Sequence, residues 1–262
     1  MILPASYLNG FAPRDGEPLY PSLWKGCVGA WNPGLGPSGL TLRDQSGFGN
    51  NGTLTNGPTW AASQGKYAMS FDGTDDYVPT RVIAATNEVT FAAWFSPRNV
   101  VSHQSICSDA NSAGAIINFH MEVNPNGKLG MLWGSNPYFR PEGATLLVVG
   151  QWYHGAVIRS GSSGAWSYRI HLNGKVDASG TTATNPGAAS TFTIGRPGEY
   201  PFAQYINAFI DDVRIYNRAL SPDEIRTLAT RRGMAYEMAP RRRSSVQVTT
   251  NRRRRIIIGG NR

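Results

Sequence analysis

A series of short β-rich segments, separated by glycine, proline and asparagine, constrains the fold more than any other feature. Such segments lie at 66–71, 88–95, 115–123, 128–133, 152–159, 166–172, 191–195 and 206–216. Several alternate between apolar and polar side chains, which is typical of strands with one buried face. The chain has 30 glycines, 17 prolines and only 16% charged residues, which favours strands and turns over long helices. We expect an all-β sandwich of two antiparallel sheets.

Two Asn-Gly pairs predict tight hairpin turns. Asn126-Gly127 and Asn173-Gly174 each lie between two of the strand-like segments. Asn-Gly tolerates the positive φ angles that such turns require. We therefore expect the strands on either side of each pair to be neighbours in a sheet.

One short helix is predicted near the C-terminal end of the sandwich, over 221–233. Ser221 serves as the cap, Pro222 occupies the first helical position and Glu224 completes a capping box. Gly233 is a residue at which the helix would end. We expect this single helix to close the domain.

The net charge of +8 is concentrated at one end of the chain. Residues 231–262 contain ten arginines and one acid, Glu237, which gives +9, whereas the rest of the chain has 15 basic and 16 acidic residues. Such asymmetry is typical of an interaction arm. We expect an extended, proline-containing N-terminal arm at 1–23, a sandwich at 24–230 and a docking arm at 231–262.

The C-terminal arm alternates between arginine clusters and apolar or β-prone segments. Its predicted partner-binding residues are Arg241, Arg242, Arg243, Arg252, Arg253, Arg254, Arg255, Ile256, Ile257 and Ile258. Arginines alone would suit a nucleic-acid tail, in which they neutralise phosphates. An exposed isoleucine run is an aggregation hazard, and phosphate contacts do not need it. The arm therefore fits docking on a protein better.

Several segments resemble one known family. "LRDQSGFGNNGTLTNGPTW" and "YAMSFDGTDDYV" resemble the opening of laminin-G-like domains of the concanavalin A-like lectin/glucanase superfamily. "LNGKVDASG", "FTIGR" and "FIDDVRIYNRALSPDEI" resemble its middle and end, in the same order, over about residues 24–229. The resemblance implies a jelly-roll sandwich, in agreement with the strand pattern. It does not fix the function, since members include carbohydrate-binding modules, adhesion domains, hydrolases and structural modules.

The resemblance also implies a structural Ca²⁺ shared by Asp44 and Asp211. Strict alternation places Asp211 on the same face as Val213 and Ile215, which we expect to be buried. A buried carboxylate must be paired, hydrogen-bonded or metal-bound, and oxygen ligands from a Gly/Asn-rich loop suit Ca²⁺. The alternative is that Asp211 only accepts hydrogen bonds from backbone N–H groups of the loop at 43–52.

Glycan binding requires exposed aromatic side chains with a few convergent polar groups. The segment "WGSNPYFRPEG" offers such a set, namely Trp133, Asn136, Tyr138 and Arg140. The alternative is ordinary packing of a loop, because aromatic side chains in a β-sandwich lie more often in the core.

No catalytic motif is present in the sequence, and we expect no enzyme. The chain lacks the alternating Glu and Asp of glucanases in this superfamily, and it lacks His-Glu-x-x-His, Gly-x-Ser-x-Gly and a phosphate-binding loop. Apart from the Ca²⁺, no cofactor is expected. No signal peptide and no apolar stretch of membrane-spanning length is recognised.

A lectin-like sandwich followed by an arginine-rich tail resembles bacteriophage virion proteins that decorate capsids or form fibres. We therefore expect a virion structural protein, assembled in the host cytoplasm, docked on capsid or other virion proteins and homo-oligomeric. The first alternative is a carbohydrate-binding or adhesion module for a host glycan. The second is a nucleic-acid-binding protein that uses the tail.

Overall fold

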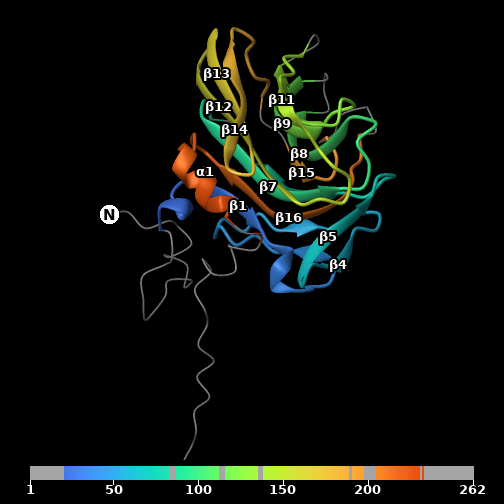
Figure 1. Ribbon diagram of the computed structural model, residues 1–262. Helices are drawn as coiled ribbons and strands as arrows, with labels where there is room; N and C mark the ends of the chain where they lie inside the picture. The colour runs from blue at the N-terminus through green and yellow to red at the C-terminus, as the bar shows by residue number, and fades with distance from the viewer. Residues whose placement is uncertain are drawn as a thin grey trace, which may run out of the picture.

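The computed structural model describes residues 21–82, 86–111, 116–134, 138–188, 191–197, 204–230 and 232. Figure 1 shows these residues in colour, as two sheets that face each other with one short helix beside them. The predicted all-β sandwich of two antiparallel sheets is confirmed. The ten predicted partner-binding residues of the C-terminal arm, and most of both arms, lie outside the described residues.

The large sheet contains eight strands of the described chain, in the order β14-β13-β12-β7-β16-β5-β4, with β1 also paired to β16. Their bounds are β1 Cys27–Trp31, β4 Thr59–Ser63, β5 Lys66–Asp72, β7 Val89–Pro97, β12 Tyr153–Ser162, β13 Ala165–Leu172, β14 Lys175–Thr182 and β16 Asn207–Tyr216. Neighbouring strands of this sheet run antiparallel.

The small sheet has the order β11-β10-β9-β8-β15-β6 within the described residues. Its bounds are β6 Val78–Val82, β8 Gln104–Asn111, β9 Ile116–Val123, β10 Lys128–Gly134, β11 Glu142–Leu146 and β15 Thr191–Ile194. Four short elements complete the described chain: η2 Pro21–Trp24, η3 Pro33–Leu35, β2 Thr41–Leu42 and β3 Gly52–Thr53. Every strand-like segment predicted from the sequence overlaps one of these strands.

The two predicted hairpins join neighbouring strands. Asn173 and Gly174 have φ angles of 49° and 80° and connect β13 to β14. At the other turn Gly127 has a φ of 72°, and its N–H donates to Asn124 O over 3.0 Å, between β9 and β10. Both Asn-Gly predictions are therefore confirmed.

The predicted helix is α1, which spans Pro222–Leu228 and so ends earlier than expected. The capping box is present, because Glu224 N–H donates to Ser221 Oγ over 3.3 Å and Ser221 N–H donates to Glu224 Oε2 over 2.9 Å. Ile225 and Leu228 are buried against the large sheet. Among the described residues, no helix is long and apolar enough to cross a membrane.

The main core lies between the inner faces of the two sheets. Trp31 of the large sheet stacks on Phe192 of the small sheet, with ring centroids 5.3 Å apart. Phe91 meets Phe119 and Phe192 edge-on, at 4.8 and 5.3 Å. Burial of each such side chain stabilises the fold by about 1.5–3 kcal/mol. Aromatic contacts across the layers therefore fix how the sheets face each other.

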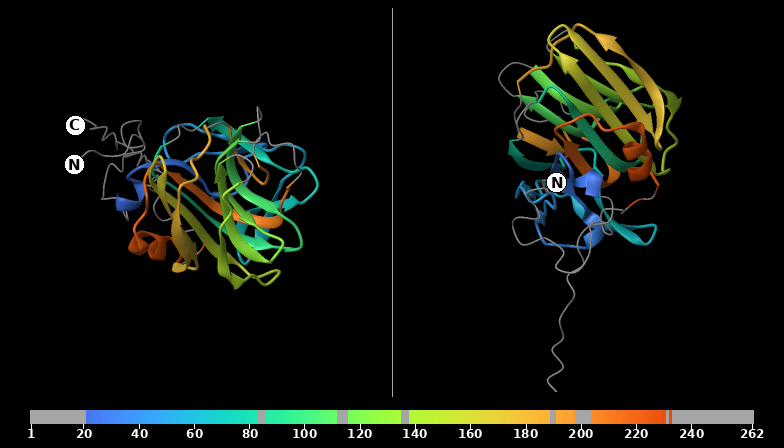
Figure 2. Two further views of the ribbon diagram at one scale, coloured as in Figure 1. Left: turned by 90° about the horizontal axis from the view of Figure 1, so that it is seen from above. Right: turned by 90° about the vertical axis from the view of Figure 1, so that its left-hand side faces the viewer.

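A second apolar cluster covers the outer face of the large sheet, the face that is turned away from the small sheet. Leu23 and Trp24 of η2 pack there with the apolar side of α1, and Figure 2 shows both elements on this side of the molecule. Arg232, which is only 9% exposed, also lies against the sandwich. The packed body thus begins before residue 24 and continues past residue 230.

Strand β16 departs from strict alternation at its centre. Its ladder with β7 contains one extra residue between Asp211 and Arg214, and Asp212 has a φ of 47°. Asp211 pairs with Trp94 and faces outward, whereas Val213 belongs to the main core. The expectation that Asp211 shares the face of Val213 is therefore wrong, because a β-bulge shifts the alternation by one residue.

Candidate functional site

The outer face of the small sheet carries a set of buried polar side chains. Antiparallel pairing places Ser105 opposite Glu122, and Ser108 opposite both His120 and Thr193. Directly paired residues point to the same face of a sheet. We call Ser105, Ser108, His120, Glu122 and Thr193 the polar cluster. Each is at most 1% exposed, although this face is turned away from the main core.

His120 is the member of the polar cluster with the most unusual surroundings. It is fully buried, and neither ring nitrogen has a hydrogen-bond partner in the described structure; the hydroxyls of Ser105 and Ser108 also lack partners. Burial, with smaller contributions from Arg140 and His103, lowers the pKa of His120 to about 4. The ring is therefore neutral at pH 7 and offers one donor and one acceptor. An unpaired buried polar group costs about 1–3 kcal/mol, a cost that an ordered water bound to these groups would offset.

Glu122 is held by two side chains that reach the surface. Its Oε2 lies 3.1 Å from His103 Nδ1, and its Oε1 lies 3.4 Å from Arg140 Nε. Arg140 Nη1 lies 2.9 Å from His103 Nε2. Because a guanidinium only donates, His103 Nε2 accepts and its Nδ1–H donates to Glu122. These three residues form a closed ring, the Glu122 ring, in which the side chains of His103 and Arg140 are 30% and 31% exposed and that of Glu122 is 0% exposed.

The loop after β10 covers the neighbouring part of the same face. Tyr138 packs on a small apolar cluster made of Ala110, Ile117 and Leu132. Leu132 pairs with His120, so this cluster lies beside the polar cluster on the outer face. Two of the four predicted glycan-binding residues, Tyr138 and Arg140, are therefore brought together over one surface.

Trp133 does not belong to that surface. It lies in the main core with no exposed area, its indole N–H donates to Thr184 O over 2.8 Å, and its ring lies 4.8 Å from that of Phe139. The expectation that Trp133 is exposed to a glycan is wrong. Trp133 lies two residues after Met131 on β10, so both side chains point to the same, inward face. Asn136 lies outside the described residues.

The alternation of polar residues along β9 is a sequence signal for the polar cluster, and it is not one of the acidic motifs considered above. Polar side chains occupy every second position of β9, at Asn118, His120, Glu122 and the following Asn124. Such alternation predicts one polar face on a strand. An extra residue in β9 turns the side chain of Asn118 inward, where its Nδ2 donates to Asp109 Oδ2 over 2.7 Å. The bulge therefore limits the outward polar series to the second half of the strand.

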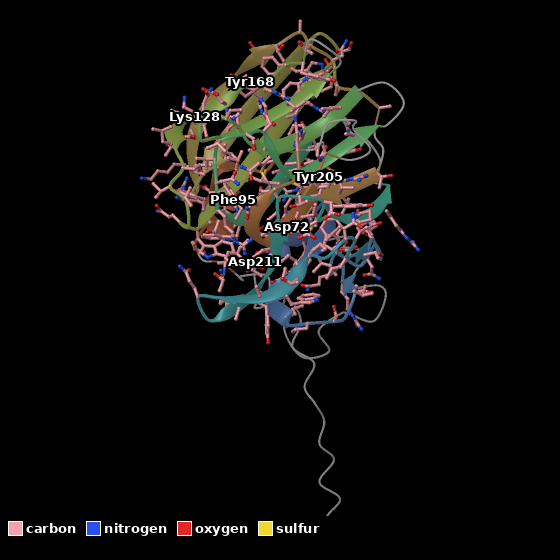
Figure 3. All side chains as sticks on the ribbon, turned by 90° about the vertical axis from the view of Figure 1, so that its right-hand side faces the viewer. Asp72, Phe95, Lys128, Tyr168, Tyr205 and Asp211 are labelled. Carbon is pink, nitrogen blue, oxygen red and sulfur yellow. The ribbon has the colours of Figure 1, made fainter. Side chains whose placement is uncertain are left out.

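A second glutamate, Glu142 of β11, lies on the same face, two strands away from Glu122 of β9. Gly130 pairs with Glu122 on one side and with Glu142 on the other. Glu142 accepts hydrogen bonds from Lys128 Nζ over 2.9 Å and from Asn126 Nδ2 over 2.8 Å, and these bonds lower its pKa. Both carboxylates are thus engaged by neighbouring donors. Figure 3 shows Lys128, the partner of Glu142, apart from Asp211 of the large sheet.

The residues expected to share a calcium ion have separate partners. Asp44 accepts hydrogen bonds from the N–H groups of Ala30, Ser46 and Asn50 at 2.8–3.0 Å, and from the Ser46 hydroxyl. The carboxylate of Asp211 lies 3.4 Å from Arg232 Nε. Asp211 Oδ2 has no hydrogen-bond partner in the described structure. The Ca²⁺ shared by Asp44 and Asp211 therefore stays a prediction.

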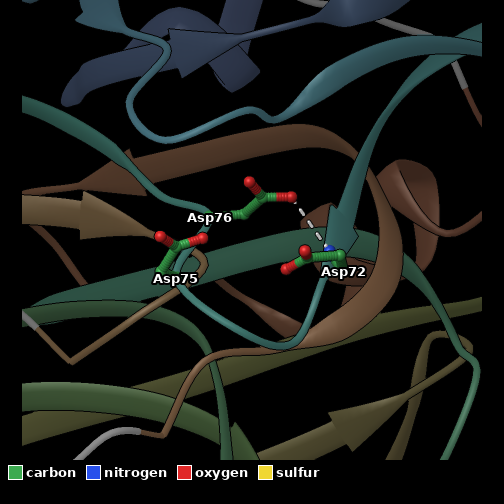
Figure 4. Close-up of side chains that lie close together, drawn as sticks. All are labelled: Asp72, Asp75 and Asp76. Atoms are coloured by element: carbon green, nitrogen blue, oxygen red, sulfur yellow. Dashed lines mark hydrogen bonds between the residues drawn. The ribbon is translucent and has the colours of Figure 1, made fainter.

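A different acidic group lies in the turn after β5. One carboxylate oxygen from each of Asp72, Asp75 and Asp76 lies within 4.8 Å of the others, as Figure 4 shows. Asp76 is buried, which raises its pKa, and it accepts a hydrogen bond from Asp72 N–H over 3.0 Å. Asp72, Asp75 and Asp76 together form the one group of Asp, Glu, His or Cys side chains with metal-compatible spacing among the described residues. Their oxygen donors are of the type that Ca²⁺ prefers.

Two antiparallel sheets in this arrangement define the chain as a lectin-like β-sandwich. Residues 72–226 match the family described as the Concanavalin A-like lectin/glucanases superfamily. This is more than half of the chain, which therefore belongs to that superfamily. A search among curated protein sequences gave no match.

Solved structures show the same fold. Domain 4 of AbnA, a GH43 extracellular arabinanase from Geobacillus stearothermophilus, in complex with arabinotriose, is 21% identical over 78% of this chain and 98% of that domain, with a TM-score of 0.63. The ligand binding domain of Botulinum neurotoxin serotype D, in complex with N-acetylneuraminic acid, is 11% identical over 79% of this chain, with a TM-score of 0.61. The binding domain of Paraclostridial Mosquitocidal Protein 1 is 13% identical over 79% of this chain, also with a TM-score of 0.61. This chain covers about half of each toxin domain, 51% and 52%.

Proposed function

We propose that this protein is a non-enzymatic glycan-binding module, whose ligand contacts the Glu122 ring and Tyr138 on the outer face of the small sheet. One observation carries the proposal. A fully buried glutamate holds an arginine and a histidine at the surface, beside a buried histidine whose ring nitrogens have no partner among the described residues. Sugar sites combine convergent polar groups with an aromatic surface in this way.

The charge of the Glu122 ring favours a neutral sugar. Arg140 directs Nε and Nη1 at Glu122 and His103, while its Nη2 donates to no described residue. His103 Nε2 faces Arg140 Nη1 and is already engaged, and the arginine charge is offset by Glu122. Sugar hydroxyls both donate and accept, so they match the exposed Nη2 of Arg140 without requiring a charged group on the ligand.

The state of the two glutamates supports binding without catalysis. Glycoside hydrolysis uses a pair of carboxyl groups, one of which acts as an acid with a raised pKa. The pKa of Glu142 is lowered by Lys128 and Asn126, and Glu122 is engaged by Arg140 and His103. Both carboxylates are thus engaged as acceptors by neighbouring side chains.

Calorimetric titration with two sugars tests this function. Arabinotriose is the neutral probe and N-acetylneuraminic acid is the anionic one, taken from the ligands of the similar structures. We expect arabinotriose to bind more tightly, and Arg140→Ala to weaken it about tenfold or more, since a hydrogen bond to a charged group contributes about 1.5–3 kcal/mol. Arg226→Ala removes an exposed arginine from α1 and is the matched control. Equal affinity in wild type and Arg140→Ala would overturn the proposed site.

We further propose that the module is displayed on a larger assembly, a virion, and docked on capsid or other virion proteins by residues 231–262. The described sandwich completes its core without the arm, whereas the arm carries the whole positive excess of the chain. Arginines at Arg241–Arg243 and Arg252–Arg255 would pair with acidic side chains, and Ile256–Ile258 would bury apolar surface. The same proposal includes assembly in the host cytoplasm and homo-oligomerisation.

A further inference from the structure

Arg232 is buried at a point where the chain leaves the described sandwich. Its Nε lies 3.4 Å from Asp211 Oδ2, its guanidinium lies 4.1 Å from the ring centroid of Trp152, and its Nη2 donates to Ser63 O. Its own carbonyl accepts a hydrogen bond from Lys66 Nζ over 2.5 Å. One arginine thus contacts three segments that are distant in sequence: the β4–β5 hairpin, the residue before β12 and strand β16. We call Ser63, Trp152 and Asp211 the arginine seat.

The arginine seat matches a guanidinium and not merely a positive charge. A planar guanidinium stacks on an indole ring while its edge donates to a carboxylate and a carbonyl. The seat is held by the sheet itself, because Trp152 Nε1 donates to Ser63 Oγ over 3.2 Å and its ring stacks on Phe209 at 6.3 Å. Removal of Arg232 would therefore leave a preformed site for a guanidinium.

Asp211 is the titratable part of the seat. The bulge in β16 places it on the outer face, where it has no exposed area. Burial and the nearby Asp212 raise its pKa to about 7, against the lowering effect of Arg232 and Lys66. Asp212 is itself paired with Arg214 at 2.7 Å, and the facing side chain on β7 is the non-titratable Trp94.

We propose that the arginine seat fastens the C-terminal arm to the sandwich through Arg232. The guanidinium lies against the Asp211 carboxylate, the Ser63 carbonyl and the Trp152 ring. Loss of the Asp211 carboxylate would leave a buried arginine whose Nη1 already lacks a partner in the described structure, so the seated state would lose its main electrostatic compensation. The proposal does not depend on glycan binding.

Trypsin provides a direct readout, because it must take the Arg232 side chain into its own pocket to cleave after that residue. Cleavage after Arg232 is followed by mass spectrometry at one pH and normalised to a peptide that contains the same bond. We expect the normalised rate to rise several-fold in Asp211→Asn, which lacks the carboxylate that contacts Arg232. Asp75→Asn, in the turn after β5, is the matched control and should cleave at the wild-type rate. Equal rates in wild type and Asp211→Asn would overturn the proposal.

Chemical rescue separates a seat for arginine from general stabilisation. In Arg232→Ala, we expect millimolar guanidinium chloride to change the fluorescence of Trp152 towards the wild-type value, with sodium chloride at equal ionic strength as the control. Arg232→Ala with Trp152→Phe identifies the signal of that tryptophan, and Arg226→Ala is the control for a lost arginine. If sodium chloride acts equally, or if guanidinium has no effect, then the seat does not recognise a guanidinium.

Discussion

Arg140 Nε lies 3.4 Å from Glu122 Oε1, and this contact joins a surface loop to a residue with no exposed area in the middle of the small sheet. The loop can therefore be positioned by a group that never reaches solvent. Since Glu122 also accepts from His103, one buried carboxylate orients two surface side chains. The following predictions depend on this and the other contacts described above.

Glu122→Gln should weaken arabinotriose binding about tenfold, because Arg140 and His103 lose the charge that orients them. Glu142→Gln is the matched control, since Glu142 lies on the same face but bonds to Lys128 and Asn126. Calorimetry with both variants, together with their melting temperatures, gives the comparison. A similar loss of affinity in both variants would show that the Glu122 ring has no special part in binding.

Tyr138→Ala should mainly lower sugar affinity, whereas Trp133→Ala should mainly lower the unfolding free energy. Trp133 is in the main core, so its truncation should cost about 3–5 kcal/mol of unfolding free energy. Tyr138 is only partly buried, and its truncation should lower sugar affinity with a much smaller loss of stability. Denaturant unfolding and calorimetry measure the two quantities. A larger stability loss in Tyr138→Ala would contradict the assignment of these residues.

Asp44→Ala should lower the unfolding free energy by about 2–4 kcal/mol, because it leaves buried backbone N–H groups without an acceptor. The loss should be the same in calcium and in a chelator, since Asp44 is already occupied by protein donors. Asp75→Asn, in the turn after β5, is the comparison for a calcium effect elsewhere. A loss for Asp44→Ala that appears only in calcium would support the ion shared with Asp211.

The raised pKa of Asp211 makes the free energy of unfolding depend on pH between about pH 4 and pH 7. Its folded pKa of about 7 is raised above the ordinary value of 3.8, so the folded state binds the extra proton in this window. Stability from this group is therefore greatest at low pH, falls by up to about 1.4 kcal/mol per pH unit as pH rises, and is constant above 7. His120, with a pKa lowered to about 4, contributes the opposite slope.

The contribution of Asp211 is isolated by comparing wild type with Asp211→Asn. Denaturant unfolding at pH 5 and pH 8 should give a difference between the two proteins that changes across this window, while the slope of His120 cancels. A constant difference would mean that Asp211 does not titrate between these values. Deletion of residues 233–262, which leaves Arg232 in place, should not alter this result.

The same deletion tests the proposed role of the C-terminal arm. We expect the truncated protein to fold, to bind arabinotriose with wild-type affinity and to fail to enter the virion or other assembly. A copy in which only Arg252–Arg255 are replaced by lysine should be incorporated less well, because lysine lacks the bidentate donor geometry. Normal incorporation of the truncated protein would contradict docking through the arm, and strong salt-dependent DNA binding by the isolated arm would favour the nucleic-acid alternative.

Periodicity and turn chemistry predicted much of the fold, because they report local preferences. The capping box at Ser221 and Glu224 and the turn at Asn173-Gly174 were found in this way. Strand β8 was missed, because its outward face carries serines that only the tertiary structure buries. The position of Asp211 was mispredicted, since a bulge changes the face of every residue beyond it and has no signature in the alternation itself.

The candidate site was predicted only in part for a related reason. The loop at Tyr138 and Arg140 was identified from its composition, but Glu122 and His103 reach it through strand pairing, which composition does not report. A polar residue at every second position of β9 was the available signal. Its meaning depended on which face of the sheet is covered, and a single sequence does not contain that information.

The central claim is that a glycan binds at the Glu122 ring, and its most direct test is an NMR titration of the isotopically labelled protein with arabinotriose. We predict saturable shift changes centred on His103, His120 and Arg140, which are absent in Arg140→Ala and preserved in Arg226→Ala. Saturable changes centred elsewhere, for example on the turn at Asp72–Asp76, or no changes at all up to millimolar sugar, would contradict it.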